Sequence, residues 1–109
     1  MENIEKLSKE YSQLQQQIQT FYIQKENSRV ELNEINTALD ELKTVEGDVF
    51  KQAGIIIIKS APKKVSKELE EKKEIIELRI RSIEKKESAL KEKFQKLHQE
   101  LLSAQETTE

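Results

Sequence analysis

The sequence predicts a mainly α-helical fold, an antiparallel two-helix coiled coil with one β-hairpin between the helices. Three observations support this prediction: the composition, two long heptad repeats, and one short β-prone segment between them. Of the 109 residues, 37% are charged and only 35% are hydrophobic, with two Gly, one Pro and no Trp. Abundant Glu, Lys, Leu and Gln with few helix breakers is typical of long helices and coiled coils. We expect one domain over residues 1–109.

The first helix is expected over residues 2–44. A heptad repeat runs from residue 4 to residue 42, and ten of its twelve seam positions are apolar, the exceptions being Lys25 and Ser28. A repeat of 3.5 residues keeps one side of a helix facing a partner helix. The apolar seam residues are Ile4, Leu7, Tyr11, Leu14, Ile18, Phe21, Leu32, Ile35, Leu39 and Leu42.

The second helix is expected over residues 62–106. Nine of eleven seam positions are apolar, and the exceptions are Lys73 and Glu87. Pro62 suits a first helical turn because its missing N–H has no intrahelical partner there, while Ser66 to Glu70 offers an alternative, later start. The apolar seam residues are Leu69, Ile76, Ile80, Ile83, Leu90, Phe94, Leu97, Leu101 and Ala104.

Between the helices, residues 48–59 are expected to form a β-hairpin. Gly47-Asp48 interrupts the first helix, and the following residues are rich in β-branched and aromatic side chains around Ala53-Gly54. Two short strands joined by a tight turn fit this pattern best. The chain then folds back on itself, so the two helices are antiparallel.

Pairing the two seams gives a testable register. Opposed residue numbers sum to 108, which places Leu39 against Leu69 and Leu32 against Ile76. The same register puts Lys25 and Glu87 in adjacent layers, where we expect them to form an ion pair that fixes the alignment. The alternative is that both long side chains extend outward to water.

The run Ile55 to Ile58 predicts oligomerisation. Alternating side chains would direct Ile55 and Ile57 to one face and Ile56 and Ile58 to the other, so both faces of the hairpin are apolar. Two helices of the same chain can cover one face at most. We therefore expect hairpins from several subunits to join into a closed barrel or packed sheets, through Val49, Phe50, Gly54 and the four isoleucines. The alternative is a sticky connector that associates without specificity.

Several classes of function are disfavoured by what the sequence lacks. A net charge of −2 gives no electrostatic reason to expect nucleic acid or an anionic membrane as partner. There is one histidine, His98, no cysteine, and no Gly-rich phosphate loop, so neither a metal site, a cofactor nor an enzyme is expected. No apolar run reaches the length of a signal peptide or a membrane span, which makes a cytoplasmic protein the expectation.

The hairpin DVFKQAGIIIIK, followed by the helix KELEEKKEIIELRIRSIEKKESALKEKFQKL, resembles the β-class subunits of prefoldin, the hexameric chaperone of archaea and eukaryotes. The most specific part is Phe50-Lys51, then Gly54 at the turn, an aliphatic run to Lys59, and the stretch from Leu69 to Glu74. The first strand is less aliphatic, and the link to the second helix less acidic, than is usual in the family. A single hairpin indicates the β class, because α-class subunits carry two.

The resemblance implies a mechanism. It implies an assembly of two α-class and four β-class subunits, whose hairpins form a double β-barrel carrying six coiled coils. It also implies an ATP-independent holdase that captures unfolded polypeptides between the coiled-coil tips and delivers them to a group II chaperonin. The competing hypothesis is a structural coiled-coil tether or stalk that binds no client.

The tip itself is expected where the first and last helical turns meet, about 40 residues and roughly 60 Å from the hairpin at 1.5 Å per helical residue. End layers fray, and fraying exposes apolar surface that can hold an unfolded chain. For all but one of these residues, ordinary coiled-coil packing is the alternative. The exception is Leu102, which lies off the seam. The expected client-binding residues are Ile4, Leu7, Tyr11, Leu97, Leu101, Leu102 and Ala104.

Overall fold

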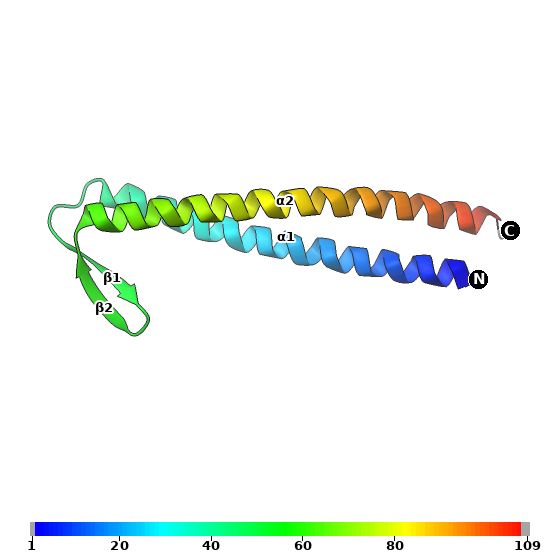
Figure 1. The fold of residues 1–109 in the computed structure, drawn as a ribbon, viewed down its shortest axis with the longest axis horizontal. Coiled ribbons are helices and arrows are strands. Elements are labelled where there is room, and N and C mark those ends of the chain that lie inside the picture. Colours follow the sequence, from blue (N-terminus) through cyan, green and yellow to red (C-terminus); the bar gives the residue numbers. More distant parts are fainter. Residues whose placement is uncertain (1, 108–109) are drawn as a thin grey trace. The chain divides into compact units, whose positions relative to one another are not determined.

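A computed structural model describes residues 2–107 of the chain. Helix α1 spans Glu2–Leu42, strand β1 Val49–Ala53, strand β2 Ile56–Ser60, and helix α2 Pro62–Thr107. The fold class predicted from the sequence is confirmed, since two long helices are connected through one antiparallel β-hairpin (Figure 1).

The contacts within the chain fall into two compact parts. The hairpin part spans Asn27–Ile80, and the terminal part joins the residues up to Glu26 with those from Arg81 onward. Each part contains a segment of α1 and a segment of α2.

The core of the hairpin part is a single apolar cluster. Its buried members are Ile35, Leu39, Ile76 and Ile80, with Leu32 and Leu69 packed against them. All six are seam positions of the two heptad repeats, so the apolar stripe of α1 faces that of α2, as a coiled coil requires. Complete burial of each such side chain stabilises the folded state by roughly 1.5–3 kcal/mol.

In the terminal part, the seam contains aromatic as well as aliphatic contacts. The Tyr11 ring stacks on the Phe94 ring with 4.5 Å between centroids, and it lies 5.9 Å from the His98 ring. Ile83 and Leu97 are buried. Early residues of α1 therefore pack on late residues of α2, which is the antiparallel arrangement. Phe94 and His98 lie on either side of Leu97 in the sequence. Leu97 is the residue expected opposite Tyr11, since the numbers of opposed residues sum to 108.

Helix α1 ends at Leu42, the last position of the heptad repeat and two residues before the expected helix end at residue 44. The next residues form a turn in which the backbone N–H groups of Lys43 and Thr44 donate to the carbonyls of Asp40 and Glu41, both at 3.3 Å. The connection then passes through Gly47, whose φ of 89° is accessible mainly to glycine.

The hairpin pairs Val49 with Ser60 and Ala53 with Ile56, leaving Gly54 and Ile55 as the two-residue turn. Gly54 has a φ of 63°, the left-handed conformation that a tight turn needs. Ile55 therefore lies in the turn and is outside the alternation of the strand, unlike the sequence-based expectation.

Helix α2 begins at Pro62, so the earlier of the two predicted starts is correct. The Ala61 carbonyl accepts hydrogen bonds from the backbone N–H groups of Lys64 and Val65, at 3.1 and 3.2 Å. Pro62 lacks the N–H that would have no partner in this first turn.

Candidate functional site

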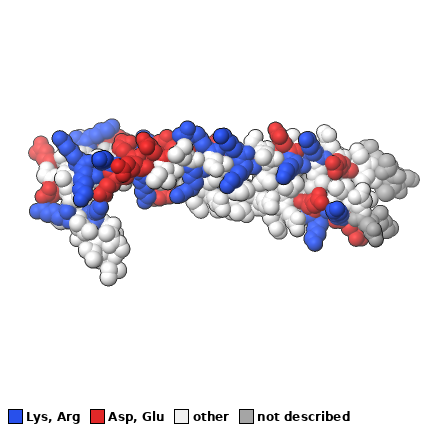
Figure 2. Space-filling model, viewed as in Figure 1, with Lys and Arg blue, Asp and Glu red and all other residues white. Residues whose placement is uncertain are grey.

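The hairpin presents the most exposed apolar side chains of the hairpin part. Phe50 is 69% exposed, Ile57 is 70% exposed, and Ile55 at the turn is fully exposed. Figure 2 shows the far end of the hairpin as an uncharged surface. The residues predicted to mediate oligomerisation are gathered here: Val49, which is half-buried, and Phe50, Gly54, Ile55, Ile56, Ile57 and Ile58, which are exposed.

Strand pairing assigns these residues to two faces. Cross-strand partners point to the same side of a hairpin, so Phe50 and Lys59 share one face with Gln52 and Ile57. The opposite face carries Val49, Lys51 with Ile58, and Ala53 with Ile56. Both faces therefore carry apolar side chains. Because Ile55 lies in the turn, the apolar residue that shares a face with Ile57 is Phe50 and not Ile55.

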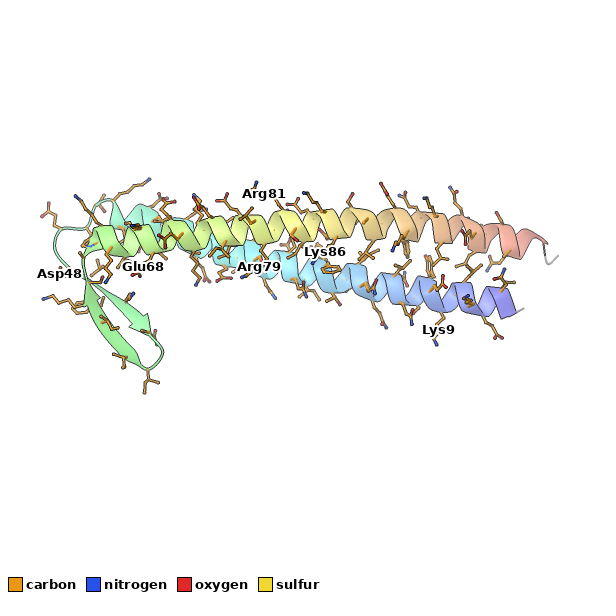
Figure 3. All side chains as sticks on the ribbon, in the orientation of Figure 1. Lys9, Asp48, Glu68, Arg79, Arg81 and Lys86 are labelled. Atoms are coloured by element: carbon orange, nitrogen blue, oxygen red, sulfur yellow. The ribbon has the colours of Figure 1, made fainter. Side chains whose placement is uncertain are left out.

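An ion pair joins the second face to helix α2. The Lys51 Nζ donates a hydrogen bond of 2.8 Å to the Glu68 Oε2. This bond and the charge of the Lys51 ammonium hold the pKa of the Glu68 carboxyl below its ordinary value. At the base of the hairpin, Lys59 and Asp48 form a second, more exposed pair at 3.4 Å. Figure 3 labels Asp48 and Glu68 beside the hairpin. Of the two pairs, the Lys51–Glu68 contact ties the hairpin to α2.

Sequence reasoning missed the Lys51–Glu68 contact. The two residues are 17 positions apart in the chain and belong to different elements. The available signal was Lys51 itself, a cation that lies opposite Ile58 in the hairpin.

Within the described residues, β1 and β2 form a two-stranded sheet, so each strand has an unpaired edge. Unpaired N–H and C=O groups on such an edge are a template for pairing with another strand. Each isoleucine left in water also forgoes roughly 1.5–3 kcal/mol of burial. Backbone and side chains together make the hairpin a surface suited to strand addition.

The residues predicted for the client-binding tip lie in the first and last turns of the terminal part. Leu102 is 47% exposed, as expected for a position outside the seam, whereas Leu97 is buried. The others are half-buried, namely Ile4, Leu7, Tyr11, Leu101 and Ala104. The structure thus brings these residues to the same end of the terminal part, with one leucine clearly open to solvent.

Lys25 and Glu87 form an ion pair in the terminal part. The Lys25 Nζ lies 2.7 Å from the Glu87 Oε1, and the two side chains are only 14% and 5% exposed. The Lys25 ammonium also lies 5.8 Å from the centre of the Tyr22 ring. The side chains thus meet within the seam and do not extend outward to water. Their role in fixing the register stays a prediction.

Within residues 2–107, neither helix contains a stretch long and apolar enough to cross a membrane. Within the same residues, histidine and carboxylate side chains form no group of three that could hold a metal ion.

Comparisons with known proteins cover almost the whole chain. The family model described as "Prefoldin subunit" matches residues 5–107. The chain is 36% identical to the prefoldin subunit beta of Archaeoglobus fulgidus over 90% of its own length and 86% of that protein. It is 31% identical to the prefoldin subunit beta of Pyrobaculum calidifontis, over 91% of its length and 81% of that protein.

A solved structure gives the same result. The crystal structure of the prefoldin beta subunit from Thermococcus strain KS-1 superposes with a TM-score of 0.86 at 33% sequence identity, covering 94% of this chain and 91% of that one. Prefoldin subunits are chaperones and not enzymes, and they form hetero-oligomers with other prefoldin subunits. The chain therefore belongs to the prefoldin subunit family, and its relatives place it among the beta subunits.

Proposed function

We propose that this chain is one subunit of an ATP-independent holdase in the cytoplasm. Two α-class and four β-class subunits form the assembly, and their hairpins close into a double β-barrel. The assembly captures unfolded polypeptides at its coiled-coil tips and transfers them to a group II chaperonin. No cofactor takes part.

The exposure of the hairpin is the observation that supports this proposal most strongly. Phe50 and Ile57 on one face, and Ile56 and Ile58 on the other, are all exposed in the single chain. Hydrophobic burial of that size is comparable to the 5–15 kcal/mol that stabilises a whole small domain. Joining hairpins edge to edge buries the side chains and pairs the free strand edges at the same time.

Client capture is assigned to the other apolar feature, the end of the coiled coil formed by the first and last helical turns. Leu102 is the exposed residue of this group. Its sequence neighbour Leu101 and the register partner of Leu101, Leu7, are half-buried. Contacts between terminal turns open more readily than central ones, so unfolded chains can bind there without a defined sequence.

The experiment compares two leucines with similar exposure. Leu102→Ser changes the proposed tip, whereas Leu78→Ser changes a leucine of the hairpin part that is 60% exposed and outside the proposed tip. Both variants are assembled with an α-class prefoldin subunit and tested for suppression of aggregation of a chemically denatured model protein. We expect Leu102→Ser to suppress aggregation less well than the wild-type assembly and Leu78→Ser to match the wild type, with assembly intact in both.

Two results would contradict the proposal. Equal holdase activity of the two variants would remove Leu102 from the capture site. A wild-type assembly without holdase activity would favour the structural tether. Release of the bound protein on addition of a group II chaperonin tests the transfer step, and client that stays bound to the holdase would contradict that step.

A further inference from the structure

Helix α1 contains a long uncharged stretch in the terminal part. From Tyr11 to Gln24 there is no Asp, Glu, Lys or Arg, although 37% of the whole chain is charged, and six of these residues are glutamines. Figure 2 shows a broad uncharged band along this part of α1. Exposed faces of long helices ordinarily carry mixed charge, so the band is a departure from the rest of the molecule.

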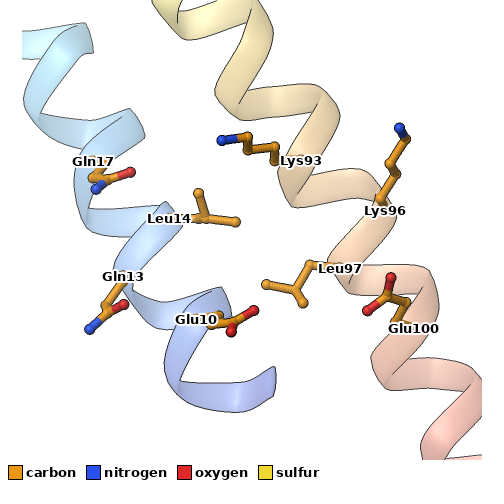
Figure 4. A pocket seen from close by; sticks show the side chains of 8 residues that line it. All are labelled: Glu10, Gln13, Leu14, Gln17, Lys93, Lys96, Leu97 and Glu100. Atoms are coloured by element: carbon orange, nitrogen blue, oxygen red, sulfur yellow. The ribbon is translucent and has the colours of Figure 1, made fainter. Parts of the chain in front are cut away.

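Several open hollows follow this stretch, and two of them share Gln13 and Gln17. One, of about 350 Å³, has Gln13, Leu14 and Gln17 on its α1 side and Lys93 and Leu97 on its α2 side (Figure 4). The other, of about 700 Å³, is lined by Gln13, Gln16, Gln17, Thr20, Phe21 and Gln24. Because Gln13 and Gln17 line both hollows, they form one continuous surface, which we call the amide groove.

The corresponding flank of the hairpin part is closed by ion pairs. There, the Glu31 carboxylate on α1 lies 3.4 Å from Lys72 and 3.8 Å from Arg79 on α2. Positions seven residues apart repeat the same place on a coiled-coil flank. The heptad therefore allows the two parts of the chain to be compared position by position.

In the terminal part, the cations of this pattern are kept and the carboxylate is replaced. Seven and fourteen residues before Glu31 are Gln24 and Gln17, while seven and fourteen residues after Arg79 are Lys86 and Lys93. An amide has no charge with which to neutralise an ammonium. The flank of the terminal part therefore lacks the ion pairs that bridge the two helices in the hairpin part, and it is open as the amide groove.

Both lysines lie beside the groove. The Lys86 ammonium is 5.7 Å from the centre of the Phe21 ring, which lines the larger hollow. Lys93 extends toward the α1 side and Gln17 in Figure 4. The carboxylates that line the groove, Glu10 and Glu100, lie at the end of the smaller hollow nearer the chain termini.

We propose that the amide groove binds an extended, acidic segment of a non-native polypeptide. Glutamine amides can donate to and accept from its unpaired peptide groups, Lys86 and Lys93 can pair with its carboxylates, and the half-buried Leu14 and Phe21 can contact its apolar side chains. A second copy of this surface is a poor occupant, because it would bring the same lysines against each other. The inference rests on the proposed holdase function and adds a client class that the apolar tip does not select.

The decisive variant restores the ion-pair pattern of the hairpin part. Gln17→Glu with Gln24→Glu supplies carboxylates to Lys93 and Lys86. The control is Asn27→Glu with Asn33→Glu, the same charge change at two exposed amides of α1 that line neither hollow. The probes are three fluorescent, unstructured peptides of equal length and apolar content that carry four Glu, four Gln or four Lys. Binding to each is measured with the assembled protein.

We expect the wild type to bind the Glu peptide most tightly and the Lys peptide least tightly. Gln17→Glu/Gln24→Glu should bind the Glu peptide about three- to tenfold more weakly, whereas the control should lose markedly less. The thermal midpoint of the groove variant should stay unchanged or rise, which separates lost binding from unfolding. A second variant, Lys86→Gln/Lys93→Gln, should abolish the preference for the Glu peptide.

Equal losses of affinity for the Glu peptide in the groove variant and its control would contradict the groove proposal without affecting tip capture. A change in oligomeric mass caused by the groove variant alone would also contradict the groove proposal, since the surface would then be occupied by another subunit. If Leu102→Ser fails to reduce aggregation suppression while the groove variant still loses the Glu peptide, tip capture is overturned and the groove stands.

Discussion

Lys25 and Glu87 are charged residues in an otherwise apolar seam, and their separation of 2.7 Å lets each compensate the burial of the other. Removing two charges from water carries a large desolvation cost, so such a pair adds little net stability. Breaking it is a different matter, because one charge is then left buried without its partner. The pair is therefore suited to reject other alignments of the two helices.

We predict that Lys25→Met lowers the free energy of unfolding by about 3 kcal/mol, because Glu87 would keep a buried, unpaired carboxylate. Urea denaturation followed by circular dichroism measures the change. The double variant Lys25→Met/Glu87→Leu should recover most of the loss, and a double variant as unstable as the single one would contradict the explanation.

The register role needs its own measurement. The chain has no cysteine, so pairs of introduced cysteines report helix alignment without background. Disulfides between positions 14 and 94 should dominate in the wild-type background, and the apolar double variant should also form disulfides with positions one heptad away. An unchanged pattern in the apolar variant would show that the seam residues fix the register without the pair.

Individual polar positions were the hardest to predict from the sequence. The heptad showed that Lys25 and Glu87 lie in adjacent layers, because spacing alone determines the layer. It could not decide whether the side chains turn inward or outward, since that depends on rotamers and on the neighbouring Tyr22 ring. The Lys51–Glu68 contact was missed because its two residues come from different elements.

At the scale of elements, the hairpin and helix α2 are coupled by the Lys51–Glu68 bond. The folded-state pKa of Glu68 is lowered from its ordinary value of 4.5, so the unfolded chain takes up the proton first as the pH falls. The stabilising effect of the bond is therefore complete above that value and is lost as the pH falls through the lower, folded-state pKa.

We predict that the stability difference between the wild type and Glu68→Gln is constant from pH 7 to about pH 5 and shrinks below it. Thermal unfolding of both proteins across this range measures the difference. Glu70→Gln, which changes an exposed carboxylate on the same helix, serves as the control. A difference that persists unchanged at pH 3 would contradict a role for the ionised Glu68.

The hairpin isoleucines should affect assembly without affecting the folded chain. Ile57 is 70% exposed, so Ile57→Asp removes little intramolecular packing and should change the unfolding free energy of the isolated chain by no more than about 0.5 kcal/mol. In an assembled barrel it would leave a carboxylate in apolar surroundings. We predict that native mass spectrometry detects no hetero-oligomer for Ile57→Asp. The control is Ile75→Asp, at an exposed helix position, which should still assemble.

The elements themselves were predictable because their signals are local. Leu32, Ile35 and Leu39 follow the helical repeat, and Pro62 marks a helix start by its own chemistry. The end of α1 and the turn were less certain, since Thr44 and Ile55 are compatible with more than one local conformation. Strand pairing decided the second case by leaving Gly54 and Ile55 as the turn.

At the scale of the whole molecule, the chain has two kinds of exposed surface. The hairpin offers strand edges and isoleucines that another folded subunit can complete, whereas the terminal turns and the amide groove offer surface suited to a chain without defined structure. The family comparisons support the first partner, since prefoldin subunits form hetero-oligomers. The amide groove was not predicted from the sequence, because the ion pairs of Glu31 with Lys72 and Arg79 that define the pattern are seen only in the structure.

The measurement that tests the account most directly is the native mass of this chain alone and mixed with an α-class prefoldin subunit. The account predicts one complex of two α-class subunits and four copies of this chain in the mixture, formed through the exposed hairpin. A stable monomer under both conditions, with Phe50 and Ile57 still open to solvent, would contradict it.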